Sequence, residues 1–294
     1  MDLRQLRYFV ATAEELHFGR AAERMHIAQP ALSIQIKALE DTLGVRLLAR
    51  TNRVVTLTEA GRLFLKEARR TLEQAEHAAV VARRAGRGEM GHIDIGYDAN
   101  GAYSGVLSAT IRHYRRHAPD VELGLHELPP ETQVMAVMEG QIHVGFVTRP
   151  TQALPQELDA IRLAEWPLRV ALPSDHPLAD RSRVPREALA DEPFIGFTKS
   201  AGENYGSFVQ QVVGFMPRMA YQADSGFALV SLVGAGLGVA VVPSSIGTIN
   251  VGESVVYRPI LGVTERLGID LVFRRDEEDP AVTNFLTIVR QGER

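Results

Sequence analysis

The sequence predicts a protein of mixed fold class, in which a small helical head and a long connecting helix precede a larger α/β body. Three observations predict it. Short helical patterns fill the first 44 residues, a heptad pattern lies within residues 59–86, and strand patterns alternate with helical ones from residue 90 onward. At 294 residues the chain exceeds what one hydrophobic core usually organises, so two or three domains are expected.

The head begins with a helix over residues 3–15 and a shorter one over residues 18–25, each with apolar residues at helical spacing. The small pair Ala21-Ala22 allows these helices to cross closely. After a break at residues 26–28, a third helix begins at Gln29-Pro30 and ends at Gly44. Two short helices joined by a three-residue turn form a helix-turn-helix pattern. Two short strands, 45–50 and 54–57, are expected to form a wing.

A long helix is expected after the wing. Thr58 is a suitable N-cap and Glu59 a suitably acidic first residue, and Gly86 and Gly88 end the helix. Leucine and alanine recur along it in a heptad seam, at positions 65, 68, 72, 75, 79 and 82. We interpret the seam as a dimer contact. The alternative is a helix that lies on the surface of its own domain.

The body has the pattern of an α/β domain. Strand–helix–strand alternation implies a parallel, doubly wound arrangement with ligands at the carboxyl ends of strands. We expect two lobes, with the chain crossing between them near residues 160–167 and 260–267. The expected strands are 92–97, 121–127, 143–148, 168–173, 194–197, 239–243, 255–259 and 268–273. The expected helices are 103–117, 131–139, 203–214, 225–235 and 280–291.

Charge is distributed unevenly between head and body. Residues 1–87 contain 15 basic and 10 acidic residues, whereas residues 88–294 contain 17 and 26. The basic head indicates a polyanion as its partner. The absence of cysteine excludes disulfides and thiolate metal sites. With no secretory pattern at the N-terminus and no apolar run of about 20 residues, we expect a soluble, cytoplasmic protein without a membrane partner.

Residues 20–33, Arg-Ala-Ala-Glu-Arg-Met-His-Ile-Ala-Gln-Pro-Ala-Leu-Ser, closely resemble the helix-turn-helix of LysR-type transcriptional regulators. The likeness continues through residues 39–40, 43–50 and 57–61. It returns in residues 234–243, Gly-Ala-Gly-Leu-Gly-Val-Ala-Val-Val-Pro, which resemble the effector-domain signature of that family.

The resemblance implies a DNA-binding regulator with a winged helix-turn-helix at 1–58 and a dimerising linker helix at 59–88. It implies a periplasmic-binding-protein-like effector domain at 89–294, with lobe I at about 89–163 and 267–294 and lobe II at about 164–266. It also implies homodimers that pair into tetramers, a small-molecule effector and no cofactor. RNA polymerase is a further candidate partner.

In the family, four positions of the third helix approach the base edges of double-stranded DNA: Gln29, Pro30, Ser33 and Ile34. Gln29 suits adenine, Ser33 suits several base edges, and Lys37 suits a phosphate. Ile34 stands where polar residues are more usual, and we hypothesise that it contacts a thymine methyl group. Four arginines are candidates for contacts with the DNA backbone, each with a solvated surface charge as the alternative: Arg4, Arg20, Arg50 and Arg53.

Effector contacts are expected where strands end and helices begin, since free N–H groups there favour anions. Arg149 is the preferred carboxylate ligand, and a salt bridge to the loop of Asp98 is its alternative. Asp98 itself indicates an effector that also carries a hydroxyl or amine. Phe197 and Phe227 are candidates for an apolar wall, with core packing as the alternative. The remaining polar candidates are Asn100, Gly101, Ser104, Thr132, Thr148, Ser200 and Asn204.

Three other functions are set aside. The run Gly234-x-Gly236-x-Gly238 has dinucleotide-site spacing but follows a helix and precedes a strand, the reverse of the required order. His113 and His117 are four residues apart on a helix but lack a third metal ligand nearby. No catalytic constellation is identifiable, so we expect neither an enzyme nor a metal site. The alternative to a regulator is a small-molecule binding module whose head only oligomerises.

Overall fold

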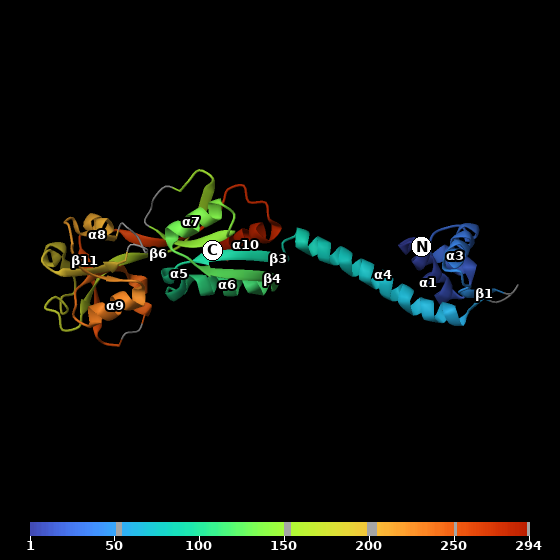
Figure 1. The fold of residues 1–294 in the computed structure, drawn as a ribbon, viewed down its shortest axis with the longest axis horizontal. Helices are drawn as coiled ribbons and strands as arrows, with labels where there is room; N and C mark the ends of the chain where they lie inside the picture. The colour runs from blue at the N-terminus through green and yellow to red at the C-terminus, as the bar shows by residue number, and fades with distance from the viewer. Residues whose placement is uncertain (51–54, 150–153, 199–204, 250–251, 293–294) are drawn as a thin grey trace. The chain divides into compact units, whose positions relative to one another are not determined.

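The structure, a computed structural model, describes the whole chain except residues 51–54, 150–153, 199–204, 250–251 and 293–294. The chain divides into two units, Met1–Arg84 and Ala85–Arg294. The first unit contains a helix-turn-helix, a two-stranded wing and most of the long helix (Figure 1). Its elements are α1 (Leu3–Glu15), α2 (Phe18–Arg24), α3 (Gln29–Leu43), β1 (Leu48–Arg50), β2 (Val55–Leu57) and α4 (Glu59–Gly86).

The helices of the head pack as their apolar spacing predicts. Ala21 and Ala22 are buried where α2 meets its neighbours, which confirms the close crossing. Gly44 ends α3 in the left-handed conformation, with φ of 67°. The first wing strand begins later than expected, because the N–H of Val45 bonds the carbonyl of Glu40 and so completes the helix end. The Glu40 carboxylate then accepts from the N–H groups of Leu47 and Leu48, at 2.8 and 3.0 Å.

The predicted cap of α4 is confirmed, since Thr58 Oγ1 accepts from the N–H of Gly61 at 2.9 Å. The seam along α4 is divided. Its first half, Leu65, Ala68 and Leu72, packs against the apolar core of the head. In this half, the alternative interpretation of a helix lying on its own domain is correct. The second half of the seam begins at Ala75, which is half-buried, and continues through the exposed Ala79 and Ala82.

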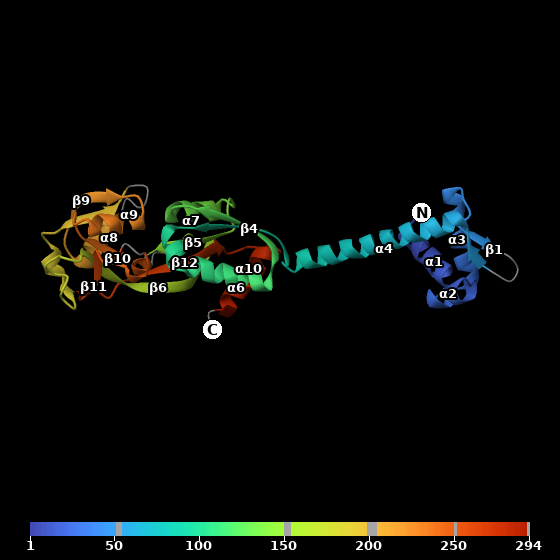
Figure 2. The same ribbon diagram turned by 90° about the horizontal axis from the view of Figure 1, so that it is seen from below.

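Lobe I of the second unit is a sheet covered on both faces by helices. Figure 2 shows α7 on one face and α6 with α10 on the other. The strand order is β4-β3-β5-β12-β6. The elements are β3 (Met90–Tyr97), α5 (Ala99–Tyr103), α6 (Val106–His117), β4 (Asp120–Glu127), α7 (Pro130–Met138), β5 (Val144–Arg149), β6 (Leu158–Pro173), β12 (Arg266–Arg274) and α10 (Pro280–Gly292).

Lobe II is built around the second half of β6, which pairs with β10 and β11. A parallel pair, β8 and β9, joins it through a bridge between Phe194 and Val239. The elements are β7 (Val184–Pro185), the short helix η1 (Arg186–Leu189), β8 (Pro193–Phe197), α8 (Tyr205–Val213), β9 (Arg218–Ala223), α9 (Gly226–Gly234), β10 (Ala240–Pro243), the short helix η3 (Ser244–Thr248) and β11 (Val255–Leu261).

The expected strands and helices of the body are present, but the wholly parallel arrangement is wrong. Among the strands in the described part of the body, only β3 with β4 and β5, β8 with β9, and β11 with β7 are parallel. The chain returns from lobe II as β12 without a helical crossover, so β12 runs antiparallel to both β5 and β6. The expected crossing at 160–167 is itself strand, because β6 pairs with β12 along that stretch. The sequence pattern also missed β9.

Replacing Gly61 with alanine is expected to destabilise the head. A Cβ at this position would overlap the carbonyl oxygen of Leu47, where α4 passes close to the wing. Such overpacking costs roughly 1–3 kcal/mol. Thermal melting of the full chain measures the loss. Gly86→Ala is the matched control, since Gly86 lies in the same helix and a Cβ there would meet none of the described atoms within 4 Å. Equal melting points for the two variants would contradict the packing argument.

Candidate nucleic-acid interface and effector site

The third helix of the head presents an exposed face opposite its buried one. Leu32, Ile36 and Leu39 are buried in the core, as their spacing predicts. The predicted base-reading residues lie on the other side of α3: Gln29, Pro30, Ile34 and Lys37 are exposed, and Ser33 is half-buried. Ile34 has 65% of its surface exposed, which is unusual for a large apolar side chain in a well-packed domain.

The candidate backbone-contacting arginines differ in what holds them. Arg20 is engaged by α1, because its Nε lies 3.2 Å from Glu15 Oε2 and its Nη2 donates to the Glu15 carbonyl at 2.5 Å. Arg4 lies 3.8 Å from the carboxylate of Asp2, a contact between two exposed groups. The side chain of Arg50 and all of Arg53 lie outside the described residues.

Sequence reasoning missed the ion-pair network that fixes the head to α4. Glu14 on α1 accepts from Arg24 on α2 and from Arg69 on α4, both at 2.7 Å. Hydrogen bonds from these arginines, Arg69 first, lower the pKa of Glu14. The three residues are 10 and 45 positions apart along the chain, so no local pattern connects them.

The two lobes are joined by a chain of polar contacts that begins at Ser245 in lobe II. Ser245 Oγ donates to Asn100 Oδ1 at 2.9 Å, and Asn100 Nδ2 donates to Thr148 Oγ1 at 3.1 Å. Thr148 Oγ1 in turn donates to Asp98 Oδ1 at 3.0 Å. A second contact between lobes runs from Thr248 Oγ1 to the carbonyl of Tyr103, at 2.8 Å. Asn100, Thr148 and their neighbours are thus brought together as predicted.

Asp98 serves this junction as a helix cap. Its Oδ1 accepts from the N–H of Gly101 at 2.8 Å, and its Oδ2 accepts from the N–H of Thr148 at 2.8 Å. Burial raises the pKa of Asp98, and the hydrogen bonds it accepts oppose that rise. Because both oxygens are bonded within the protein, Asp98 positions α5 against β5. Nothing in the sequence pattern pointed to the lobe II partner, since serine at position 245 follows an ordinary apolar strand.

The other predicted effector residues are less closely grouped. Phe197 packs edge-to-face on Tyr205 at 5.4 Å, so the core interpretation holds for it, whereas Phe227 is 60% exposed. Thr132 is exposed on α7, and Ser104 is half-buried after α5. Arg149 ends β5 opposite Gly268, but its side chain lies outside the described residues. Ser200 and Asn204 also lie outside them.

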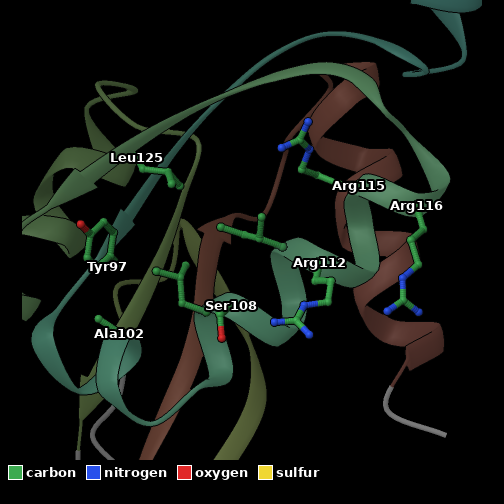
Figure 3. A pocket seen from close by; sticks show the side chains of 9 residues that line it. Tyr97, Ala102, Ser108, Arg112, Arg115, Arg116 and Leu125 are labelled. Atoms are coloured by element: carbon green, nitrogen blue, oxygen red, sulfur yellow. The ribbon is translucent and has the colours of Figure 1, made fainter.

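A hollow of about 690 Å³, unpredicted from the sequence, lies between α6 and β4 (Figure 3). Its floor is apolar and its rim carries three arginines of α6. β4 is the edge strand of lobe I. The lining residues are Tyr97, Ala102, Leu107, Ser108, Ile111, Arg112, Arg115, Arg116 and Leu125.

The sequence features set aside earlier take ordinary structural positions. Gly236 and Gly238 lie between α9 and β10, both with positive φ, so the glycine run is a helix-to-strand turn as predicted. His117 Nδ1 lies 3.0 Å from the carbonyl of His113. Among the described residues, no three histidine, aspartate or glutamate side chains are placed to hold a metal ion. In the same part of the chain, no helix is long and apolar enough to cross a membrane.

Residues 3–62 match the family described as "Bacterial regulatory helix-turn-helix protein, lysR family", and residues 86–294 match "LysR substrate binding domain". An uncharacterized HTH-type transcriptional regulator of Escherichia coli, YnfL, is 38% identical over 97% of this chain and 96% of its own length. The regulator AlsR of Bacillus subtilis is 36% identical over 98% of this chain and 95% of its own length.

Solved structures give the same result along the whole chain. Full-length CbnR, crystallised with its target DNA, superposes with a TM-score of 0.83 at 30% identity and covers 100% of both chains. Full-length OxyR of Pseudomonas aeruginosa superposes with a TM-score of 0.64 at 25% identity, covering 99% of this chain and 100% of its own.

Proposed function

The chain belongs to the LysR family of helix-turn-helix transcriptional regulators, and on this premise we propose that a small carboxylate-bearing effector, bound between its two lobes, controls its binding to specific DNA sites. The observation that carries the proposal is the polar chain from Ser245 through Asn100 to Thr148, which joins the lobes. A ligand that binds one arrangement of the lobes more tightly than another shifts the population toward it.

Binding of DNA by α3 is supported by its exposed face and by the full-length likeness to CbnR, which was crystallised with its target DNA. We propose that Gln29, Ser33 and Ile34 read base edges and that Lys37 binds phosphate. Arg4, Arg20, Arg50 and Arg53 are proposed to contact the DNA backbone. The protein would act in the cytoplasm, with RNA polymerase as a further partner, and by binding rather than catalysis.

Ile34→Arg is expected to change the preferred operator sequence at one base pair. An exposed isoleucine favours a thymine methyl group, whereas arginine favours guanine, and such a contact discriminates by about 1–3 kcal/mol. Selection from a randomised DNA pool, carried out with both proteins, measures the preference. Lys37→Gln is the control, expected to weaken all sites equally. The same base preference for Ile34→Arg and the wild type would refute the contact.

Arg149→Ala is expected to abolish the response to the effector while operator affinity is kept. The guanidinium offers paired donors matched to a carboxylate, and Arg149 ends the strand that carries Thr148. Melting shifts across small carboxylates and aromatic acids identify a ligand, since a ligand that prefers the folded state raises the melting point. Phe227→Ala tests the exposed aromatic of lobe II in the same assay. A full response in Arg149→Ala would contradict the carboxylate assignment.

The alternative function is a binding module whose head only oligomerises. Gel shifts with the upstream DNA of its gene, at several salt concentrations, separate the two functions. A regulator retains one DNA in the presence of competitor, whereas an oligomerising head shows only salt-sensitive, non-specific retention.

We propose that copies of the chain assemble through two surfaces. The exposed second half of the α4 seam, Ala79 and Ala82, would form a dimer. The hollow beside β4 would receive β9 of another copy, because β9 also lies at a sheet edge and exposes Met219 and Tyr221. Exposed apolar edge strands invite such pairing. A dimer that uses both surfaces would extend to a tetramer.

Antiparallel pairing of β4 with the partner's β9 would match opposite charges at both ends. It would place Glu127 near the partner's Arg218 and Arg115 near the partner's Asp224. We expect Arg115→Glu to dissociate tetramers into dimers, measured by sedimentation velocity. The charge swap Arg115→Glu with Asp224→Arg is expected to restore the larger species. An unchanged sedimentation coefficient in Arg115→Glu would contradict this pairing.

A further inference from the structure

Three histidines surround Asp94 on the face of the lobe I sheet that α7 leaves partly uncovered. Asp94 Oδ1 lies 2.8 Å from His126 Nε2 and 3.1 Å from His92 Nε2. His143, immediately before β5, places its Nδ1 3.8 Å from Asp94 Oδ2. Gly124, opposite Asp94 on β4, leaves room for this cluster, because a Cβ there would overlap Asp94 Oδ1.

His143 and Asp94 are joined by two reciprocal hydrogen bonds. The N–H of His143 donates to the carbonyl of Asp94 at 2.9 Å, and the N–H of Asp94 donates to His143 Nδ1 at 2.9 Å. The pair extends the β3–β5 ladder one step beyond Ile95 and Val144, with an imidazole nitrogen in place of a backbone carbonyl. An imidazole nitrogen accepts a hydrogen bond only when it carries no proton. The observed contact therefore requires an unprotonated Nδ1.

A protonated His143 would have a different partner within reach. Hydrogen bonds from the neighbouring histidines, His126 first, lower the pKa of Asp94, so this group stays a carboxylate where histidines titrate. The Asp94 Oδ2 atom is 3.8 Å from His143 Nδ1 in the observed position. Protonation thus removes an acceptor from the Asp94 N–H and adds a donor for the Asp94 carboxylate.

Other charged groups face this cluster from the neighbouring elements. Glu122 on β4 lies 4.0 Å from His92 Nδ1 and is largely exposed. From β12, Arg274 donates to the carbonyl of Ile142 at 3.2 Å and is paired with Glu277. From α7, which covers the rest of this face, Glu131 is exposed, as is Glu139 just after the helix.

We propose that the His143–Asp94 contact is a proton-sensitive switch in the effector domain. Protonation of His143 breaks the hydrogen bond from the Asp94 N–H and turns the ring toward the Asp94 carboxylate, which loosens the junction of β3 and β5. These two strands lead directly to Asp98 and Thr148 at the lobe junction. Influence on the effector response rests on the proposed function, whereas the effect on the strand junction does not.

The test compares the melting of the full-length wild type with that of His143→Asn between pH 7.5 and 5.5. Asparagine keeps an acceptor oxygen close to the Nδ1 position but takes up no proton. The stabilising contact of the wild type is present above the ordinary histidine range, near pH 6.5, and lost below it. We expect the wild type to lose about 2–4 °C relative to His143→Asn over this interval. His126→Gln, the matched control, should keep the wild-type pH dependence of the His143 contact.

Equal pH dependence in the wild type and His143→Asn would overturn the switch. Histidines 92 and 126 are present in both proteins, so their own titration cancels in the difference. Should His143→Asn fail to fold, amide exchange in the wild type provides a second measurement. At pH 6, the protection of the Asp94 amide should fall relative to that of Ile95, after correction for intrinsic exchange. An unchanged ratio would also overturn the proposal, and neither measurement involves DNA or effector.

Discussion

The antiparallel ladder between β6 and β12 determines how the larger unit is built. It pairs nine residues of β12 with the first half of β6, and the second half of β6 then pairs with β10 and β11. One strand is therefore central to both lobes. Because β12 inserts between β5 and β6, it also closes the lobe I sheet after the chain has built lobe II. A buried Asp270 on β12, paired with Arg162 on β6, accompanies the register shift in this ladder.

The polar contacts between lobes are small beside this ladder. A hydrogen bond contributes about 1 kcal/mol net, so the bonds at Ser245 and Thr248 contribute on the order of 2 kcal/mol to one arrangement of the lobes. A ligand with a differential affinity of that size can alter the balance between arrangements. The strands hold the lobes together, while a few side chains set their preferred arrangement. Such a division allows a small molecule to act without unfolding either lobe.

Periodicity alone predicted the helix-turn-helix, the α4 cap at Thr58 and the eight expected strands, because each depends on residues close in sequence. It failed where distant residues decide. The direction of β12 depends on a return from lobe II, and Ser245 meets Asn100 across 145 positions. The seam of α4 was correct as a pattern, yet Leu65 and Leu72 are buried by the head rather than by a second helix. Spacing shows that a face is apolar, not what covers it.

The shared use of α4 has a consequence for how two heads could act together. Leu65 and Leu72 fix the first half of the helix in the core of the head, and the Glu14–Arg69 contact adds an ion pair to that attachment. The head and this part of α4 therefore move as one body. A dimer formed through the second half of the same helix would hold two reading helices at a set spacing, since α4 is one continuous helix. Operator half-sites would then be recognised at one separation, and that separation would follow from the packing of leucines rather than from any residue that touches DNA.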